Sequence, residues 1–326
     1  MRARDKACDN RTLNPERSDM KILMILTSHR LDCLKIALFC LERAEAYRHF
    51  DKVVFLLNGV EGSHKAYIED YMKRRSDVPW DTVSGPRGRA ECISSLENQC
   101  IERYPHAIYI KMDEDIFVGH GWAERMLNAY EDNATAQTAL ITPLIPNNAY
   151  GLHLLCSEVF PEAGRAYVER FGEGTSPAAD GATWRLPSVA EWSTRRFMDV
   201  DKINKELTAR TSSGAPAYQT FQERFSIGCI CFDYEHWLRM GGVPAKDELE
   251  WCEWIESRKE NNIAILDHVV LHYSFYVQQD WLDRTTLLED IAAYFRADRF
   301  ILRHGPRLVR TIRQIPSILR RRLFAR

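Results

Sequence analysis

Two acidic side chains, Asp113 and Asp115, follow the apolar run "AIYIKM" and precede a second one, "IFV". Residues two apart in an extended chain point to the same side, so both carboxylates would share a side, with Glu114 on the opposite one. Mg²⁺ and Mn²⁺ bind a few carboxylates and complete their shells with water and phosphate oxygens. The spacing therefore predicts a site for Mn²⁺ or Mg²⁺ at Asp113 and Asp115.

A cation at this position suits one kind of chemistry in particular. It can bind a diphosphate and stabilise the negative charge that develops as the diphosphate leaves. A transferase that uses a nucleotide-sugar donor needs this step. The alternative is structural, because short acidic turns are common and often cap a following helix or stay in water.

Short apolar runs alternate with amphipathic segments from residue 21 onward. "KILMILTSH", "KVVFLLNG" and "AIYIKM" are typical of strands buried on both faces, and segments such as "LDCLKIALFCLERAEAYRHF" are typical of helices. This alternation predicts an α/β fold with a mainly parallel central sheet flanked by helices. Ligands of such sheets bind at the carboxyl ends of the strands, where Asp113 and Asp115 stand. We therefore expect these acids at the mouth of a binding crevice.

The pattern becomes irregular between residues 145 and 225, where Pro, Gly, Ser and Ala are frequent, as in "GEGTSPAADGATW". A long irregular stretch inside a compact protein is usually a lid, a binding insertion or disorder. We expect an insertion on the acceptor side of the site. Regular structure resumes with "RFSIGCICFDYEHWLRMGG", a strand followed by a short helix.

Composition limits the compartment and the class of protein. The chain has 326 residues, of which 45% are hydrophobic, enough for a large core. Nine cysteines without a CxxC pair indicate neither a zinc ribbon nor a disulfide scaffold, which favours a reducing cytoplasm. Residues 1–19 are polar and predict a disordered tail, and no run reaches the roughly 18 to 20 apolar residues of a membrane span.

The carboxy-terminal segment 296–326 is strongly basic, with ten Arg against one acid, Asp298. Within 306–324, apolar residues recur at helical spacing and arginines fill the remaining positions. A basic amphipathic helix of this kind can lie on an anionic membrane surface. The alternative is a terminal helix docked on the domain. Nucleic-acid binding is not expected, because no aromatic or glycine-rich RNA motif accompanies the charge.

The order of elements from 21 to 275 resembles the family 2 glycosyltransferases of the GT-A fold. Five pieces carry the resemblance, namely "KILMILTSHR", "VVFLLNGVEG", "GPRGRAECISSLENQCIERY", "AIYIKMDEDIFV" and "MGGVPAKDELEWCEWIESRKENNIAILDHVVLHY". In that order, they correspond to five elements of the family. These are the first strand with its nucleotide-binding turn, the second strand, a glycine followed by a helix, the strand that ends in DxD, and a glycine pair followed by an acidic helix, a strand and a histidine.

The resemblance implies a role for particular residues. Asp115 would be the main metal ligand, Asp113 would contact the ribose or reach the metal through water, and His272 would complete the metal shell or meet the diphosphate. The donor nucleotide would lie against Thr27, Ser28, His29, Arg30 and Asn58, with Arg89 near the diphosphate.

The same resemblance implies a catalytic base in "KDELEWCEW". Asp247 and Glu250 are three apart and share a helix face, so both are candidates, while Glu248 and Glu253 are expected to point elsewhere. The family usually has adjacent Glu and Asp here, and this chain departs from that pattern.

These expectations amount to a metal-dependent glycosyltransferase that moves a sugar from a nucleoside diphosphate sugar to a hydroxyl acceptor with inversion. The acceptor would be a glycan or lipid-linked glycan of cell-surface or glycolipid synthesis, and the enzyme would be cytoplasmic, peripheral at the inner face of the membrane. Its parts would be the tail 1–19, a GT-A-like domain at 20–275, and a helical basic extension at 276–326.

Two alternatives belong to other classes. An inactive glycan-binding or scaffolding protein could keep the fold, and the unusual base motif favours it. A nucleotidyltransferase shares the fold, but "LTSHRLD" lacks the glycine-rich phosphate loop that such an enzyme needs.

Overall fold

The computed structural model describes residues 20–178, 181–246 and 248–297. Three predictions therefore lie outside the described residues: the tail 1–19, the candidate base Asp247, and the amphipathic helix 306–324. None of the described helices has the length and hydrophobicity that crossing a bilayer would require.

A sheet of eight strands forms the centre of the fold, in the order β3-β2-β1-β4-β8-β6-β9-β7. Its strands are β1 (Lys21–Thr27), β2 (Lys52–Asn58), β3 (Trp80–Gly85), β4 (Ile108–Asp113), β6 (Thr138–Leu144), β7 (Tyr218–Phe221), β8 (Cys229–Asp233) and β9 (Asn261–Val269). The pairs β3-β2, β2-β1, β1-β4 and β6-β9 are parallel, whereas β8 and β7 run antiparallel to their neighbours. The predicted mainly parallel α/β sheet is confirmed.

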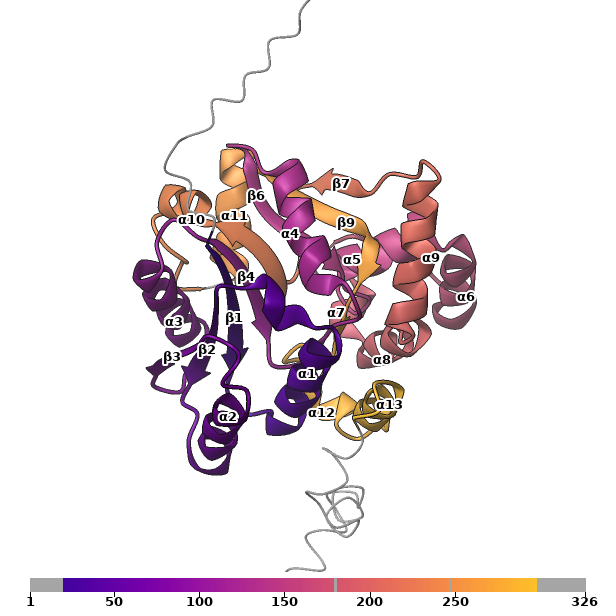
Figure 1. The fold of residues 1–326 in the computed structure, drawn as a ribbon. Coiled ribbons are helices and arrows are strands. Elements are labelled where there is room, and N and C mark those ends of the chain that lie inside the picture. The colour runs from indigo at the N-terminus through magenta and orange to yellow at the C-terminus, as the bar shows by residue number, and fades with distance from the viewer. Residues whose placement is uncertain (1–19, 179–180, 247, 298–326) are drawn as a thin grey trace, which may run out of the picture.

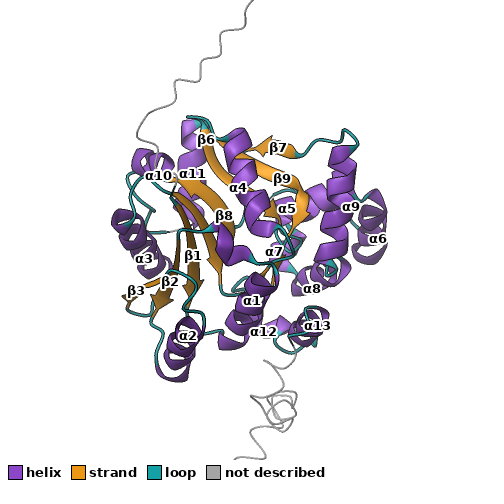
Figure 2. Ribbon diagram, in the orientation of Figure 1, coloured by secondary structure: helices purple, strands orange, loops and turns teal. Residues whose placement is uncertain are grey.

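Helices flank this sheet on both sides (Figure 2). They are α1 (Leu31–Arg43), η1 (Ala46–His49), α2 (Gly62–Arg74), α3 (Ala90–Arg103), α4 (Trp122–Asn133), α10 (Tyr234–Met240) and α11 (Glu248–Arg258). Their apolar faces bury β1, β2 and β4 almost completely. This explains why these strands are continuous apolar runs rather than alternating ones.

The segment 145–225 is largely helical, and the expectation of an irregular stretch is wrong. It contains α5 (Ala149–Leu154), the π-helix η2 (Leu155–Val159), α6 (Pro161–Phe171), α7 (Ala182–Arg185), α8 (Pro187–Arg196), α9 (Val200–Ser212) and β7. Pro161 and Pro187 occupy the first turns of α6 and α8, where proline is favoured, and Gly172 ends α6 in the left-handed conformation. These residues mark helix ends, which composition alone does not distinguish from loops.

A small second sheet brings the end of the described chain to the acids. Strand β5 (Ile116–Phe117) follows Asp115 and pairs antiparallel with β10 (Leu271–His272), which sets His272 opposite Ile116. The chain then continues into α12 (Gln279–Leu282) and α13 (Leu287–Tyr294). This pairing places a histidine from late in the sequence beside the acidic turn.

Candidate functional site

Asp113, Asp115 and His272 form one cluster at the carboxyl end of β4. Each offers a ligand atom, and these atoms lie within 4.8 Å of one another. The imidazole Nε2 of His272 is 3.4 Å from Oδ1 of Asp115, and both residues are buried. The structure thus brings together the three side chains that the sequence predicted as metal ligands.

The charges in this cluster depend on one another. Burial alone would lower the pKa of His272, but the carboxylates of Asp115 and Asp113 outweigh it and raise that pKa. Burial alone would raise the pKa of Asp115, yet the adjacent imidazole keeps it below its usual value. The pKa of Asp113 is raised, because burial and the charge of Asp115 outweigh the attraction of Lys111. An added cation would relieve this crowding of negative charge.

The donor set fits Mn²⁺ or Mg²⁺. Two carboxylates and a neutral imidazole are ligands that Mn²⁺ accepts, and carboxylate oxygens are the protein ligands of Mg²⁺. Nδ1 of His272 is buried and has no hydrogen-bond partner among the described residues. A hydrogen bond through Nδ1 therefore does not hold the ring in place.

Lys111 is a residue of this site that the sequence analysis missed. Its Nζ lies 2.9 Å from Oδ1 of Asp113 and 3.7 Å from Oε1 of Glu97, and it donates to the carbonyl of Ile227 at 3.0 Å. A lysine inside an apolar strand, two residues before an aspartate and on the same side, was the available signal. Lys111 balances part of the buried negative charge and ties β4 to the segment before β8.

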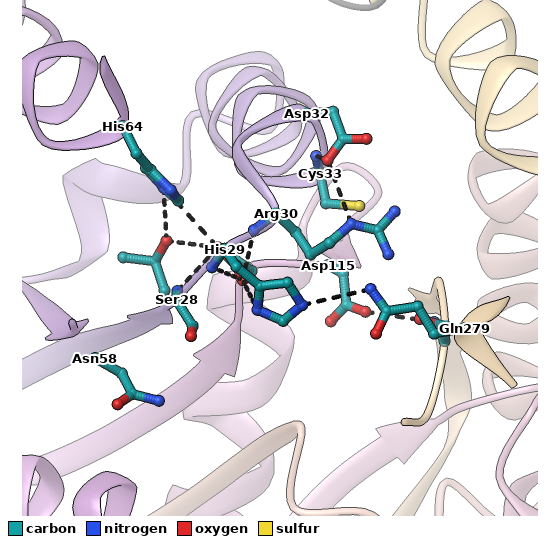
Figure 3. A network of polar contacts seen from close by, with 12 residues as sticks. Ser28, His29, Arg30, Asp32, Cys33, Asn58, His64, Asp115 and Gln279 are labelled. Atoms are coloured by element: carbon teal, nitrogen blue, oxygen red, sulfur yellow. Dashed lines mark hydrogen bonds and ion pairs between the residues drawn. The ribbon is translucent and has the colours of Figure 1, made fainter. Parts of the chain in front are cut away.

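Glu114 holds the loop between β1 and α1, of which Ser28, His29 and Arg30 are labelled in Figure 3. One carboxylate oxygen accepts from the hydroxyl of Thr27 at 2.6 Å and from the N–H of Ser28 at 3.1 Å. The other accepts from the N–H groups of His29 and Arg30, each at 3.1 Å. The acidic turn therefore sets the position of the loop that the sequence predicted to contact the nucleotide.

Thr27 itself does not line the site, and this part of the prediction needs correction. It is fully buried, and its hydroxyl lies between Glu114 and Nε2 of His64, which is 3.0 Å away. Thr27 is the last residue of β1, so its side chain turns into the layer between the sheet and α2. Its role is to support the loop.

A pocket of about 660 Å³ adjoins the cluster, and we call it the larger pocket. Its volume falls in the range typical of ligand sites. The predicted donor residues that line it are Ser28, His29, Arg30, Asn58, Arg89 and Asp113. Asp115 lines it as well, so both aspartates of the cluster form part of its wall.

Asn58 holds the loop of this pocket through both ends of its amide. Its Nδ2 donates to the carbonyl of Gly88, and its Oδ1 accepts from the N–H of Gly88, both at 2.9 Å. Gly59 adopts a φ of +64°, and a Cβ there would meet that of Arg87 at 2.1 Å. Asn58 and Gly59 thus fix the backbone of 87–89, and Asn58 acts on a ligand mainly through this loop.

Two arginines that line the larger pocket differ in how firmly contacts within the protein hold their guanidinium groups. The guanidinium of Arg30 lies 4.8 Å from the ring centre of Tyr273 and bonds Asp283 at 3.1 Å, so it is committed within the protein. The guanidinium of Arg89 lies 5.5 Å from the ring centre of the exposed Tyr276. Arg89 is therefore the better placed of the two to meet a diphosphate.

A smaller pocket of about 210 Å³ lies near His272, because two of its lining residues, Asn147 and Phe275, contact that histidine. Glu248 lines it, and Oε1 of Glu248 accepts from Nε and Nη2 of Arg224 at 3.1 and 2.9 Å. Burial raises the pKa of Glu248, although Arg224 opposes this. The negative charge of Glu248 in turn contributes to the raised pKa of His272. Glu248 is thus an acid beside the cluster.

Glu248 faces another side of α11 than Glu250, as expected, but Glu248 and not Glu250 lines a pocket. Glu248, Trp251 and Ile255 recur at helical spacing, and the latter two are buried, so this face of α11 turns inward. Glu250 lies on the opposite face and accepts from the N–H of Lys246 at 3.1 Å, with the ammonium of Lys246 at 3.2 Å. It lines neither pocket, and the face occupied by Trp251 was the signal that could have identified Glu248.

The loop after His272 separates the two pockets. Ser274 and Tyr276 line the larger pocket, whereas Phe275 between them lines the smaller one and packs 4.5 Å from the His272 ring. Buried Gln278 holds this loop, because it accepts from the N–H of Phe275 and donates to the carbonyl of Thr183. A group bound in either pocket would therefore lie beside the same cluster.

Comparisons with known proteins concern the fold. No protein-family model matches the sequence, and no curated protein is significantly similar to it. Among solved structures, the chain is similar to the mannosyltransferase PcManGT from Pyrobaculum calidifontis in complex with GDP-Man and Mn²⁺, at 12% identity and a TM-score of 0.47. That alignment covers 90% of this chain and 67% of the other.

The chain is also similar to GalNAc-T7 with UDP, GalNAc and Mn²⁺, at 11% identity and a TM-score of 0.49. That alignment covers 94% of this chain and 54% of the other, so the chain spans about half the length of that structure. Because both TM-scores are below 0.5, the function proposed below is argued from this chain's own residues.

Proposed function

We propose that this protein is a glycosyltransferase of the GT-A type, which moves a sugar from a nucleoside diphosphate sugar to a hydroxyl acceptor. The observation that carries the proposal is a cluster of three potential metal ligands, Asp113, Asp115 and His272, next to two pockets. Asp113 and Asp115 line the larger pocket, and His272 contacts Asn147 and Phe275 of the smaller one. A donor and an acceptor in these pockets would meet at the cluster, where Mn²⁺ or Mg²⁺ would neutralise the departing diphosphate.

The larger pocket suits the nucleotide part of the donor. Glu114 directs the loop at Ser28 and His29 toward it, and Asn58 fixes the loop that carries Arg87 and Arg89. Arg89 supplies positive charge for the diphosphate, next to the proposed metal ligands. The pocket thus combines polar contacts for a nucleoside with cationic contacts for phosphate.

Glu248 is the residue we propose as the catalytic base. In the smaller pocket it can accept the proton of the acceptor hydroxyl while the oxygen attacks the anomeric carbon. Attack from this pocket, opposite a diphosphate that leaves from the larger one, would invert the anomeric carbon. Arg224 would orient the carboxylate through its two hydrogen bonds to Oε1.

The basic segment 306–324 supports a further part of the proposal, which is binding at the inner face of the membrane. Arginines near an anionic surface each contribute about 1 kcal/mol to binding. Such binding would bring 20–275, the proposed catalytic domain, to lipid-linked glycans, with 276–326 as its extension. Cosedimentation with phosphatidylserine vesicles tests this, and replacing Arg320, Arg321 and Arg322 with Gln should release the protein from them.

Calorimetric binding of UDP and GDP, with and without Mn²⁺, tests the donor site. We expect one nucleotide to bind only with Mn²⁺, and Asp115→Asn to lose this binding. Asp70→Asn, at an exposed position of α2, is the matched control and should bind normally. Metal-independent or absent binding by the folded protein would contradict the proposal, and binding without any sugar transfer or donor hydrolysis would favour the inactive scaffold.

A further inference from the structure

The smaller pocket has an aromatic wall. Trp184 of α7 and Phe275 line it, with ring centres 5.6 Å apart. Trp184 keeps 39% of its surface exposed, which is unusual for so large an apolar side chain. It therefore presents apolar surface to whatever enters the pocket. Pyranose rings carry C–H groups on their faces and pack well against such rings.

Polar residues also line this pocket. Asn147, Asn148, Arg224 and Glu248 line it. Asn147 is 1% exposed, and its Oδ1 has no hydrogen-bond partner among the residues that the structure describes. Its Nδ2 donates to the carbonyl of His272 at 2.9 Å, which joins this wall to the cluster. A buried acceptor without a partner is costly, and a ligand hydroxyl would satisfy it.

The volume limits the size of the ligand. At about 210 Å³ the pocket is smaller than the roughly 300 Å³ at which sites for drug-sized ligands begin. It therefore fits one end of an acceptor, and the mixture of an aromatic wall with amide, guanidinium and carboxylate groups suits a sugar ring. A lipid tail would leave Oδ1 of Asn147 without a partner, and a peptide would not need the aromatic platform.

We propose that the smaller pocket binds the terminal sugar ring of a saccharide acceptor, stacked on Trp184, with its hydroxyls held by Asn147, Asn148 and Arg224. This inference rests on the proposed function, since the ring presents the hydroxyl that Glu248 deprotonates. Trp184 is a specificity residue of the site, supplied by the helical part of 145–225. The indole of Trp184 does not line the larger pocket.

Binding of methyl glycosides tests this directly, without any need for turnover. The probes are the methyl glycosides of glucose, galactose, mannose and N-acetylglucosamine, followed by saturation-transfer difference NMR on the full chain. We expect at least one to bind, and Trp184→Ala to weaken that binding roughly three- to tenfold, in the range of aromatic contacts. Trp184→Phe should restore most of it.

Trp281→Ala is the control, because Trp281 on α12 is 46% exposed, comparable to Trp184, but lines neither pocket. Binding of UDP and GDP with Mn²⁺ should be the same in wild type, Trp184→Ala and Trp281→Ala, which separates this inference from the donor-site proposal. Equal glycoside binding by Trp184→Ala and wild type, or no glycoside binding by folded wild type, would overturn the inference. Lost donor binding in wild type would instead overturn the proposed function.

Discussion

Replacing Glu114 with Gln is expected to disturb the loop that forms one wall of the larger pocket. The carboxylate accepts four hydrogen bonds, from the hydroxyl of Thr27 and the N–H groups of Ser28, His29 and Arg30. A Gln amide keeps one oxygen but sets an NH₂ group against the donors on the other side. The Thr27 hydroxyl can rotate, because Nε2 of His64 is 3.0 Å away, but a backbone N–H cannot.

The magnitude follows from these contacts. At least one partly buried N–H, that of Ser28, loses its acceptor, which costs about 1 to 3 kcal/mol. The hydrogen bonds from His29 and Arg30 remain but go to a neutral amide oxygen instead of a carboxylate, which lowers their contribution to stability by about 1 kcal/mol in total. We therefore expect Glu114→Gln to reduce the free energy of unfolding by about 2 to 4 kcal/mol, and to weaken nucleotide binding because Ser28 and His29 line the pocket.

Urea unfolding and nucleotide calorimetry check this prediction. Glu131→Gln is the control, since Glu131 is 58% exposed and forms one surface ion pair with Lys21, a contact worth less than about 1 kcal/mol. If Glu114→Gln were no less stable than Glu131→Gln and bound nucleotide equally well, the assigned role of Glu114 would be refuted.

Three further predictions concern neighbouring groups. Glu248→Gln should lower the rate of sugar transfer by roughly 10² to 10⁴-fold without loss of donor binding. The wild-type rate should rise with pH through a pKa above the usual glutamate value, because only the ionised carboxylate accepts a proton. Glu250→Gln should leave the rate and its pH profile unchanged, and the same loss in both variants would contradict the assignment. Lys111→Met should reduce the free energy of unfolding by about 3 to 5 kcal/mol, since it leaves Asp113 and Glu97 without the ammonium group. Lys73→Met, which removes an exposed ion pair with Asp70, should change this free energy by less than about 1 kcal/mol. Added Mn²⁺ should recover part of the loss in Lys111→Met, and unfolding curves with and without the ion decide the point. Gly59→Ala should weaken nucleotide binding, because a Cβ there collides with Arg87 and the φ of +64° disfavours alanine, while Gly174→Ala, with open space around it, should bind as wild type does.

The sheet and the two aspartates of the cluster were predictable because their signals are local. Buried parallel strands are continuous apolar runs, and the alternation with amphipathic segments fixes their direction. Asp113 and Asp115 end such a run, so their place at the sheet edge follows from topology. His272 needed the resemblance, since its partner Asp115 lies more than 150 residues away along the chain.

The remaining features depend on tertiary packing. The direction of Glu248 follows from the burial of Trp251, which no count of acidic residues reveals. The partner of Lys111 on the β8 side, the carbonyl of Ile227, becomes visible only when the two segments lie side by side. Proline and glycine at the ends of α6 and α8 resemble loop composition, so the helices of 145–225 were missed.

The most direct test of the central claim is the anomalous diffraction signal of manganese in crystals soaked with Mn²⁺ and the nucleotide that binds. The account predicts a peak between the side chains of Asp113, Asp115 and His272, with the diphosphate extending from it into the larger pocket. A peak elsewhere, or nucleotide bound in the pocket with no metal at these residues, would contradict it.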